Sequence, residues 1–79
     1  LNKKKMAKVE IKLSELPKGS TIEIGGFDYE FKGFEKRKAQ FGKQEFFIFW
    51  SETAKQEKSF ERYKFSTIKI KKDGEKYYW

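Results

Sequence analysis

The sequence predicts a small all-β domain, and three observations carry this prediction. Aromatic residues make up 19% of the 79 residues, a composition that favours strands. Several stretches alternate apolar and polar side chains, which is the pattern of a half-buried strand. Turn signals containing Gly, Pro or Asp separate these stretches, and no stretch carries the apolar stripe of a helix. We therefore expect short strands joined by short turns.

The length of the chain predicts a single domain. A chain of 79 residues can build one hydrophobic core and is too short to build two. Charged residues reach 39%, but the aromatic content is far above that of disordered segments. We expect residues 8–79 to form the domain and residues 1–7, rich in lysine, to form a flexible basic tail.

The first half of the chain predicts a bent meander of strands. Residues 8–13 alternate strictly between charged and apolar side chains, and they predict the first strand. A turn containing the only proline, Pro17, leads to a second alternating strand over residues 21–24. The two glycines that follow can take positive φ, as a tight hairpin requires, so the chain should return as a strand from Phe27 to about Arg37.

That third strand is long enough to need a bend, and Gly33 is the expected position of a bulge or kink. Residues 39–43 predict a loop, and the apolar run over residues 45–50 predicts the next strand.

The last third of the chain predicts two more strands and a hairpin. Residues 53–58 are polar and predict a turn, and residues 60–65 predict a strand. Residues 67–71 alternate cleanly. The Asp-Gly pair at residues 73–74 predicts a hairpin into residues 77–79.

Five or six short strands without an internal repeat predict a small SH3-like barrel, with an OB-like barrel as the alternative. Both barrels begin with a strongly bent meander. Residues 16–31 combine a Pro and Gly turn, a short strand, a Gly-Gly pair and an aromatic strand. This stretch is similar to many small SH3-like barrels, and the resemblance implies the fold alone.

The residue types that are missing argue against catalysis. The chain has no Cys and no His, so it lacks a thiolate nucleophile, an imidazole base, disulfides and the usual zinc ligands. Its carboxylates alternate with lysines along the expected strands instead of converging on a metal. We expect a protein that is not an enzyme and that uses no metal or cofactor.

No stretch approaches the roughly 20 apolar residues that span a bilayer. The N-terminal lysines are not followed by the apolar core of a signal peptide. The sequence thus predicts a cytoplasmic protein without a membrane partner.

Positive charge is clustered along the chain, whose net charge is +7. Residues 1–8, 36–44 and 62–72 contain basic residues and no acids, whereas the remaining segments are net acidic. If the loop after the bent strand lies beside residues 62–72, the two clusters would form one positive face that could follow a phosphate backbone. The alternative is that lysines on edge strands keep the protein soluble and block unwanted strand pairing.

The run over residues 46–50 is apolar on both faces of a strand. One face can fill the core, and the other is either exposed or covered by residues 77–79 or by the first strand. If exposed, Phe47 and Phe49 could stack on unpaired bases at about 1–3 kcal/mol each. Phe41, in the 39–43 loop, is a further surface candidate, whereas a bulge at Gly33 would turn Phe34 into the core.

These features predict a non-catalytic nucleic-acid-binding barrel that prefers single strands, because exposed rings suit unpaired bases and no recognition helix is expected. The predicted stacking rings are Phe41, Phe47 and Phe49. The cations predicted to contact phosphates are Lys36, Arg37, Lys38, Lys43, Arg62, Lys64, Lys69 and Lys71.

The rival interpretation is a protein-interaction module, such as a small regulator or inhibitor of the kind that phages and mobile elements carry. A basic and aromatic face could dock on an acidic protein surface, since interfaces also favour Tyr, Trp, Phe and Arg. A sheet edge that ends in residues 77–79 could also bind by strand addition or form a homodimer.

Overall fold

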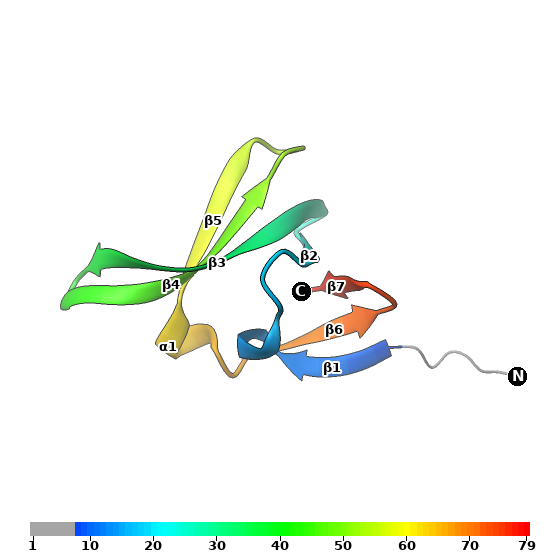
Figure 1. The fold of residues 1–79 in the computed structure, drawn as a ribbon, viewed down its shortest axis with the longest axis horizontal. Helices are drawn as coiled ribbons and strands as arrows, with labels where there is room; N and C mark the ends of the chain where they lie inside the picture. Colours follow the sequence, from blue (N-terminus) through cyan, green and yellow to red (C-terminus); the bar gives the residue numbers. More distant parts are fainter. Residues whose placement is uncertain (1–7) are drawn as a thin grey trace, which may run out of the picture.

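A computed structural model describes residues 8–79 as an all-β chain with two very short helices (Figure 1). The basic tail expected over residues 1–7 lies outside the described residues. The elements in chain order are β1 (Lys8–Lys12), η2 (Leu13–Glu15), β2 (Thr21–Ile24), β3 (Phe27–Ala39), β4 (Gly42–Ser51), β5 (Gln56–Glu61), α1 (Arg62–Phe65), β6 (Lys69–Asp73) and β7 (Lys76–Tyr78).

The strands form one sheet in the order β1-β6-β7-β2-β3-β4-β5. Neighbouring strands are antiparallel except β2 and β7, which are parallel. The predicted all-β class is confirmed, although the sheet has seven strands where five or six were expected. Within residues 8–79 the sheet is open, because its two outermost strands, β1 and β5, do not pair with each other. No helix in the described part of the chain is long and apolar enough to cross a membrane.

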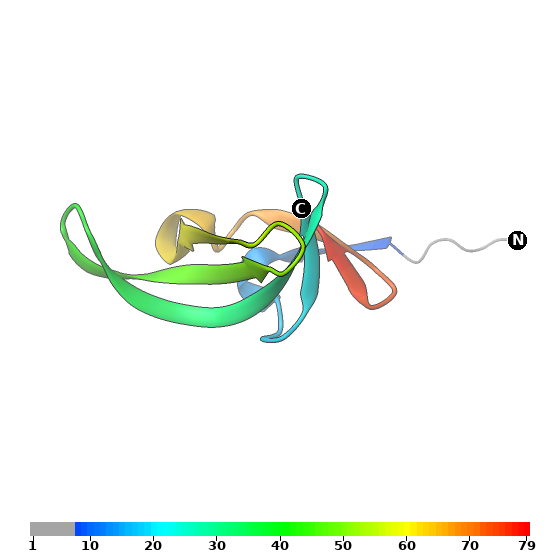
Figure 2. The ribbon, with the colours of Figure 1, turned by 90° about the horizontal axis from the view of Figure 1, so that it is seen from above.

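The long strand β3 is bent by a bulge at the predicted position. Phe31 pairs with Phe49 and Gly33 pairs with Ile48, so Lys32 is an extra residue on β3. Gly33 has φ of 102°, a conformation that residues with a Cβ rarely adopt. The bulge lets β3 pair with β2 at its start and then curve away with β4 as a long hairpin (Figure 2).

Replacing Gly33 with Ala should destabilise the protein. The new Cβ would sit on a left-handed backbone, and it would lie 3.4 Å from the aliphatic chain of Lys18. We expect a loss of about 1–3 kcal/mol, or roughly 5–15 °C in melting temperature. Thermal unfolding followed by circular dichroism measures the shift, with the exposed Ser59→Ala on β5 as a control that should change little. An unchanged melting temperature for Gly33→Ala would mean that the bulge does not depend on glycine.

An aromatic layer between the sheet and the C-terminus forms much of the core. Phe47 and Phe49 are both 0% exposed. Trp79 covers Phe49 at a ring-centroid distance of 6.2 Å and Phe60 at 4.7 Å. The prediction that Phe47 and Phe49 could stack on bases is therefore wrong, because both rings are fully buried in the core and Trp79 covers that of Phe49.

The region from residue 53 to residue 65 differs from the prediction. β5 begins at Gln56, inside the expected turn, because the chain reverses within four residues. The hydroxyl of Ser51 accepts a hydrogen bond from the backbone N–H of Ala54 in this turn. The expected strand over residues 60–65 ends at Glu61, and α1 follows. This helical turn brings Phe65 to 5.0 Å from Phe60, whereas alternation along a strand would have placed the two rings on opposite faces.

Candidate nucleic-acid interface

The β3–β4 hairpin ends in an exposed aromatic residue. Ala39 and Gly42 are its last paired residues, so the connection is a two-residue turn of Gln40 and Phe41, shorter than the predicted loop. Phe41 is 84% exposed, which confirms that its ring lies on the surface. The hairpin tip lies at one end of the molecule in both Figure 1 and Figure 2.

Three lysines share one face of this hairpin. Lys38 pairs with Lys43 across the strands, and Lys36 pairs with Glu45. Alternation therefore places all three lysines on the face that also carries Phe34. All three are exposed, and none forms an ion pair with another described residue. We call Lys36, Lys38, Phe41 and Lys43 the basic hairpin tip.

Arg37 points to the other face of the hairpin, where it is already bound. Its guanidinium donates hydrogen bonds to both carboxylate oxygens of Glu57 at 2.7 and 3.1 Å and to Glu35 at 2.8 Å. The bond to Glu57, and to a smaller extent the bond to Glu35, raises the pKa of Arg37. The bond from Arg37 in turn lowers the pKa of Glu57. The ion pair joins β3 to β5 across β4. Arg37 is thus held in a structural ion pair instead of extending beside the lysines.

The lowered pKa of Glu57 predicts a pH-dependent contribution to stability. Because the pKa of Glu57 is lower in the folded than in the unfolded protein, the ion pair stabilises the fold at pH values above the unfolded-state pKa of about 4.3. This contribution is lost as the pH falls through the folded-state pKa. The melting-temperature difference between wild type and Glu57→Gln should therefore be largest near neutral pH and shrink below about pH 4.3. Glu75→Gln is the control, because Glu75 is exposed and forms no ion pair within residues 8–79. A difference that stays constant with pH would contradict this assignment.

The two predicted cations of α1 also have partners. The guanidinium of Arg62 lies over the ring of Phe34, 4.0 Å from its centroid, and donates a hydrogen bond to Glu45. Lys64 forms an ion pair with Glu61 at 3.1 Å, which raises the pKa of Lys64. Arg62 still lies on the hairpin face that carries the lysines, because Glu45 and Phe34 belong to that face.

Phe34 has an intermediate position. The bulge turns it to the face of Phe31 and Phe47, as predicted, and its ring centroid is 4.9 Å from that of Phe47. It nevertheless remains 39% exposed, with Arg62 covering part of the ring.

Lys69 and Lys71 lie apart from the basic hairpin tip. Both are on β6, on the face opposite the buried Ile70, and Lys69 pairs with Lys12 of β1. β7 and β2 separate β6 from β3, and both views show β6 well away from the hairpin tip (Figures 1 and 2). Lys76 on β7, which lies between β6 and β2, forms ion pairs with Asp28 at 2.9 Å and Glu23 at 3.2 Å. The two predicted basic clusters therefore do not merge into one face.

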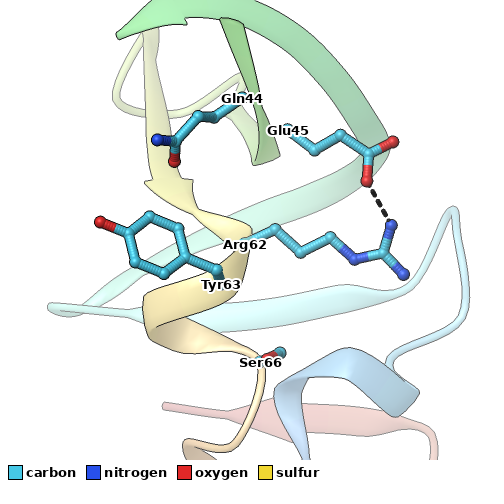
Figure 3. Close-up of a pocket in the computed structure, with 5 residues that line it drawn as sticks. All are labelled: Gln44, Glu45, Arg62, Tyr63 and Ser66. Atoms are coloured by element: carbon cyan, nitrogen blue, oxygen red, sulfur yellow. Dashed lines mark hydrogen bonds and ion pairs between the residues drawn. The ribbon is translucent and has the colours of Figure 1, made fainter. Parts of the chain in front are cut away.

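A hollow of about 520 Å³ lies between β4 and α1. It forms because β5 last pairs with β4 at Phe46, after which the chain leaves the sheet edge and enters α1. The residues that line it are Gln44, Glu45, Arg62, Tyr63 and Ser66 (Figure 3). Of these residues, only Arg62 was predicted to belong to a binding site. No local pattern could have identified the others, because the hollow depends on where β5 ends.

A second, smaller hollow is acidic. Its volume is about 220 Å³, and its lining includes the carboxylates of Asp28, Glu30 and Glu52. These side chains would repel a phosphate backbone. Within residues 8–79 no three metal-ligating side chains gather into a cluster that could hold a metal ion.

Comparisons with known proteins do not assign this chain to a family. The chain matches no protein-family model, no curated protein and no solved structure.

Proposed function

We propose that this protein binds single-stranded nucleic acid through the basic hairpin tip. One observation carries the proposal: three lysines without ion-pair partners among the described residues stand on one face of a hairpin whose turn exposes a phenylalanine. Lysines that hold phosphates beside a ring that stacks on a base are the two parts of a single-strand binding site.

The pairing of Lys38 with Lys43 supports a binding role. Like charges directly opposite each other destabilise an antiparallel pair. Arg37 on the same hairpin and Lys76 on β7 have acidic partners, whereas Lys38 and Lys43 have none among residues 8–79. The exposed Lys12 and Lys69 of β1 and β6 form a second like-charge pair, away from the hairpin. A phosphate placed between Lys38 and Lys43 would remove their repulsion and gain attraction from both.

Single strands fit this surface better than duplexes. The longest helix in the described residues has four residues, so no element offers a recognition helix for the major groove. The exposed Phe41 ring needs an unpaired base on which to stack.

We also propose that the open sheet is a variant of the SH3-like architecture. Three features support this assignment: the strand β3 bent at a bulge, the β3–β4–β5 meander that follows it, and the antiparallel pairing of β1 with β6 after a single helical turn. The parallel β2–β7 pair would then be an addition to that architecture.

Binding is tested by fluorescence anisotropy with a labelled single strand of about 12 nucleotides, a length within the site size of small β-barrels. We expect saturable binding, with log K falling against log salt at a slope of about −2 to −3, since each phosphate contact on a single strand adds about 0.7. A duplex of the same length should bind more weakly. Absence of binding at low salt would overturn the proposal and favour the protein-interaction alternative.

The Phe41→Ala variant separates stacking from charge. It should weaken single-strand binding about tenfold, because one stacked base contributes about 1–3 kcal/mol. Its melting temperature should stay unchanged, since Phe41 is 84% exposed. Phe27→Ala is the matched control, because Phe27 is an exposed aromatic at the other end of β3. Equal losses of affinity in both variants would argue against stacking at the tip.

A further inference from the structure

We propose that the hollow between β4 and α1 receives one unpaired base and favours bases with an exocyclic amino group. The inference rests on the proposed single-strand binding, and it adds a base preference that the lysines alone would not confer. It is carried by three neighbouring features of the hollow: an exposed aromatic ring, an amide oxygen without a hydrogen-bond donor and a carboxylate.

Tyr63 supplies a stacking surface at the wall of the hollow. Its side chain is 63% exposed although it belongs to α1, so it is not needed in the core. Figure 3 shows Tyr63 on the same side of the hollow as Gln44, while Glu45 and Arg62 occupy the other side. The volume of about 520 Å³ lies within the range of small-molecule sites and leaves room for a base ring.

Gln44 supplies the hydrogen-bonding group. Its Oε1 is buried and accepts no hydrogen bond from any described residue. Buried polar atoms in proteins are nearly always paired, so an unpaired amide oxygen marks a place where a donor is missing. The terminal torsion of a glutamine is soft, so the amide can rotate to meet a donor that enters the hollow. An amino group of adenine, cytosine or guanine could then donate to it.

Glu45 makes the hollow a site for a base instead of a phosphate. Its carboxylate lines the hollow and accepts a hydrogen bond from Arg62, and it would repel a second anion. The lysines of the basic hairpin tip lie on the Glu45 side of β4, where they could hold the backbone of the same nucleotide. With acceptors on both walls, a base with an amino group is favoured over thymine or uracil, which have a single ring N–H donor.

The test compares labelled strands of about 12 nucleotides made only of deoxyadenosine, deoxycytidine or thymidine, at one salt concentration. Wild type should bind the adenine and cytosine strands about fivefold or more tightly than the thymine strand, the discrimination expected from one good base contact. Gln44→Leu should remove most of this difference and leave binding to the thymine strand within about twofold. Gln44→Glu, which keeps the acceptor, should weaken all binding but retain the order of preference.

Two further measurements keep the test decisive. Gln44→Leu replaces an unpaired polar group, so a circular dichroism melt should show an intact fold. If it does not, Tyr63→Ala serves instead, since removing this exposed ring from the wall of the hollow should reduce the preference for the adenine and cytosine strands over the thymine strand.

The possible outcomes separate this inference from the proposed function. Equal wild-type affinity for the three strands, or a preference that survives in Gln44→Leu, would overturn the inference and leave single-strand binding standing. Failure to bind any strand would instead overturn the proposed function.

Discussion

A triple variant with glutamine at Lys36, Lys38 and Lys43 should bind a single strand on the order of tenfold more weakly, even at low salt, and should lose most of its salt dependence. Each lysine that contacts a phosphate contributes about −0.7 to the slope of log K against log salt, so without the three lysines the slope should be shallower by about 2. Anisotropy titrations at several salt concentrations measure both quantities.

The control for this variant changes the same number of charges elsewhere. Lys12, Lys69 and Lys71 gather on β1 and β6, away from the hairpin tip, and all three are exposed. Replacing them with glutamine should leave the affinity within a few fold of wild type. Equal losses in the two triple variants would show that net charge, not the hairpin, drives binding.

The hairpin variant also tests the repulsion between Lys38 and Lys43. Removing two like charges that face each other should preserve or slightly raise the melting temperature. Lower affinity together with unchanged or higher stability is the combination expected when residues serve binding at a cost to the fold. A clear loss of stability would contradict this interpretation.

Replacing Phe49 with Ala should remove about 3–5 kcal/mol of folding free energy, a large part of the 5–15 kcal/mol typical of a small domain. Phe49 is 0% exposed and packs against Phe31 at 5.2 Å, Phe60 at 5.9 Å and Trp79 at 6.2 Å. The deletion leaves a cavity that these rings can fill only in part. Urea unfolding followed by tryptophan fluorescence measures the loss.

Phe49→Leu is the graded control, because it leaves a smaller cavity and should cost less than Phe49→Ala. In both variants the folded fraction should keep its affinity for single strands. A loss below about 1 kcal/mol in Phe49→Ala would contradict the core position. A loss of affinity without loss of stability would restore Phe49 as a stacking residue.

Local signals predicted the backbone path well. The glycine pair after β2 and the bulge at Gly33 are where the sequence placed them, and the hairpin after β6 turns at Gly74 and Glu75, one residue later than the predicted Asp-Gly pair. Each depends on residues adjacent in the chain, because positive φ is a property of a single residue and its immediate neighbours. The turn after β4 was misplaced because Lys55 adopts positive φ of 55° without being glycine or asparagine.

The candidate site was predicted only in part. The exposure of Phe41 followed from its place in a turn between lysines, and that expectation is confirmed. Phe47 and Phe49 belong to the core instead, and Arg37, Arg62 and Lys64 have acidic partners. The hollow between β4 and α1 could not be predicted from the sequence, because the side chains that line it come from elements that meet only in the fold.

By itself, the sequence determined which side chains share a face, because the two-residue repeat of a strand is a local property. It determined in this way that Lys36 and Lys38 point together, and that an exposed ring lies at the tip between them and Lys43. Only the tertiary structure decided which apolar face is covered and which cation is neutralised. Trp79 covers Phe49 from 30 residues farther along the chain, and Glu57 binds Arg37 from 20 residues away. Burial and ion pairing depend on distances in space, which the order of residues along a strand does not specify.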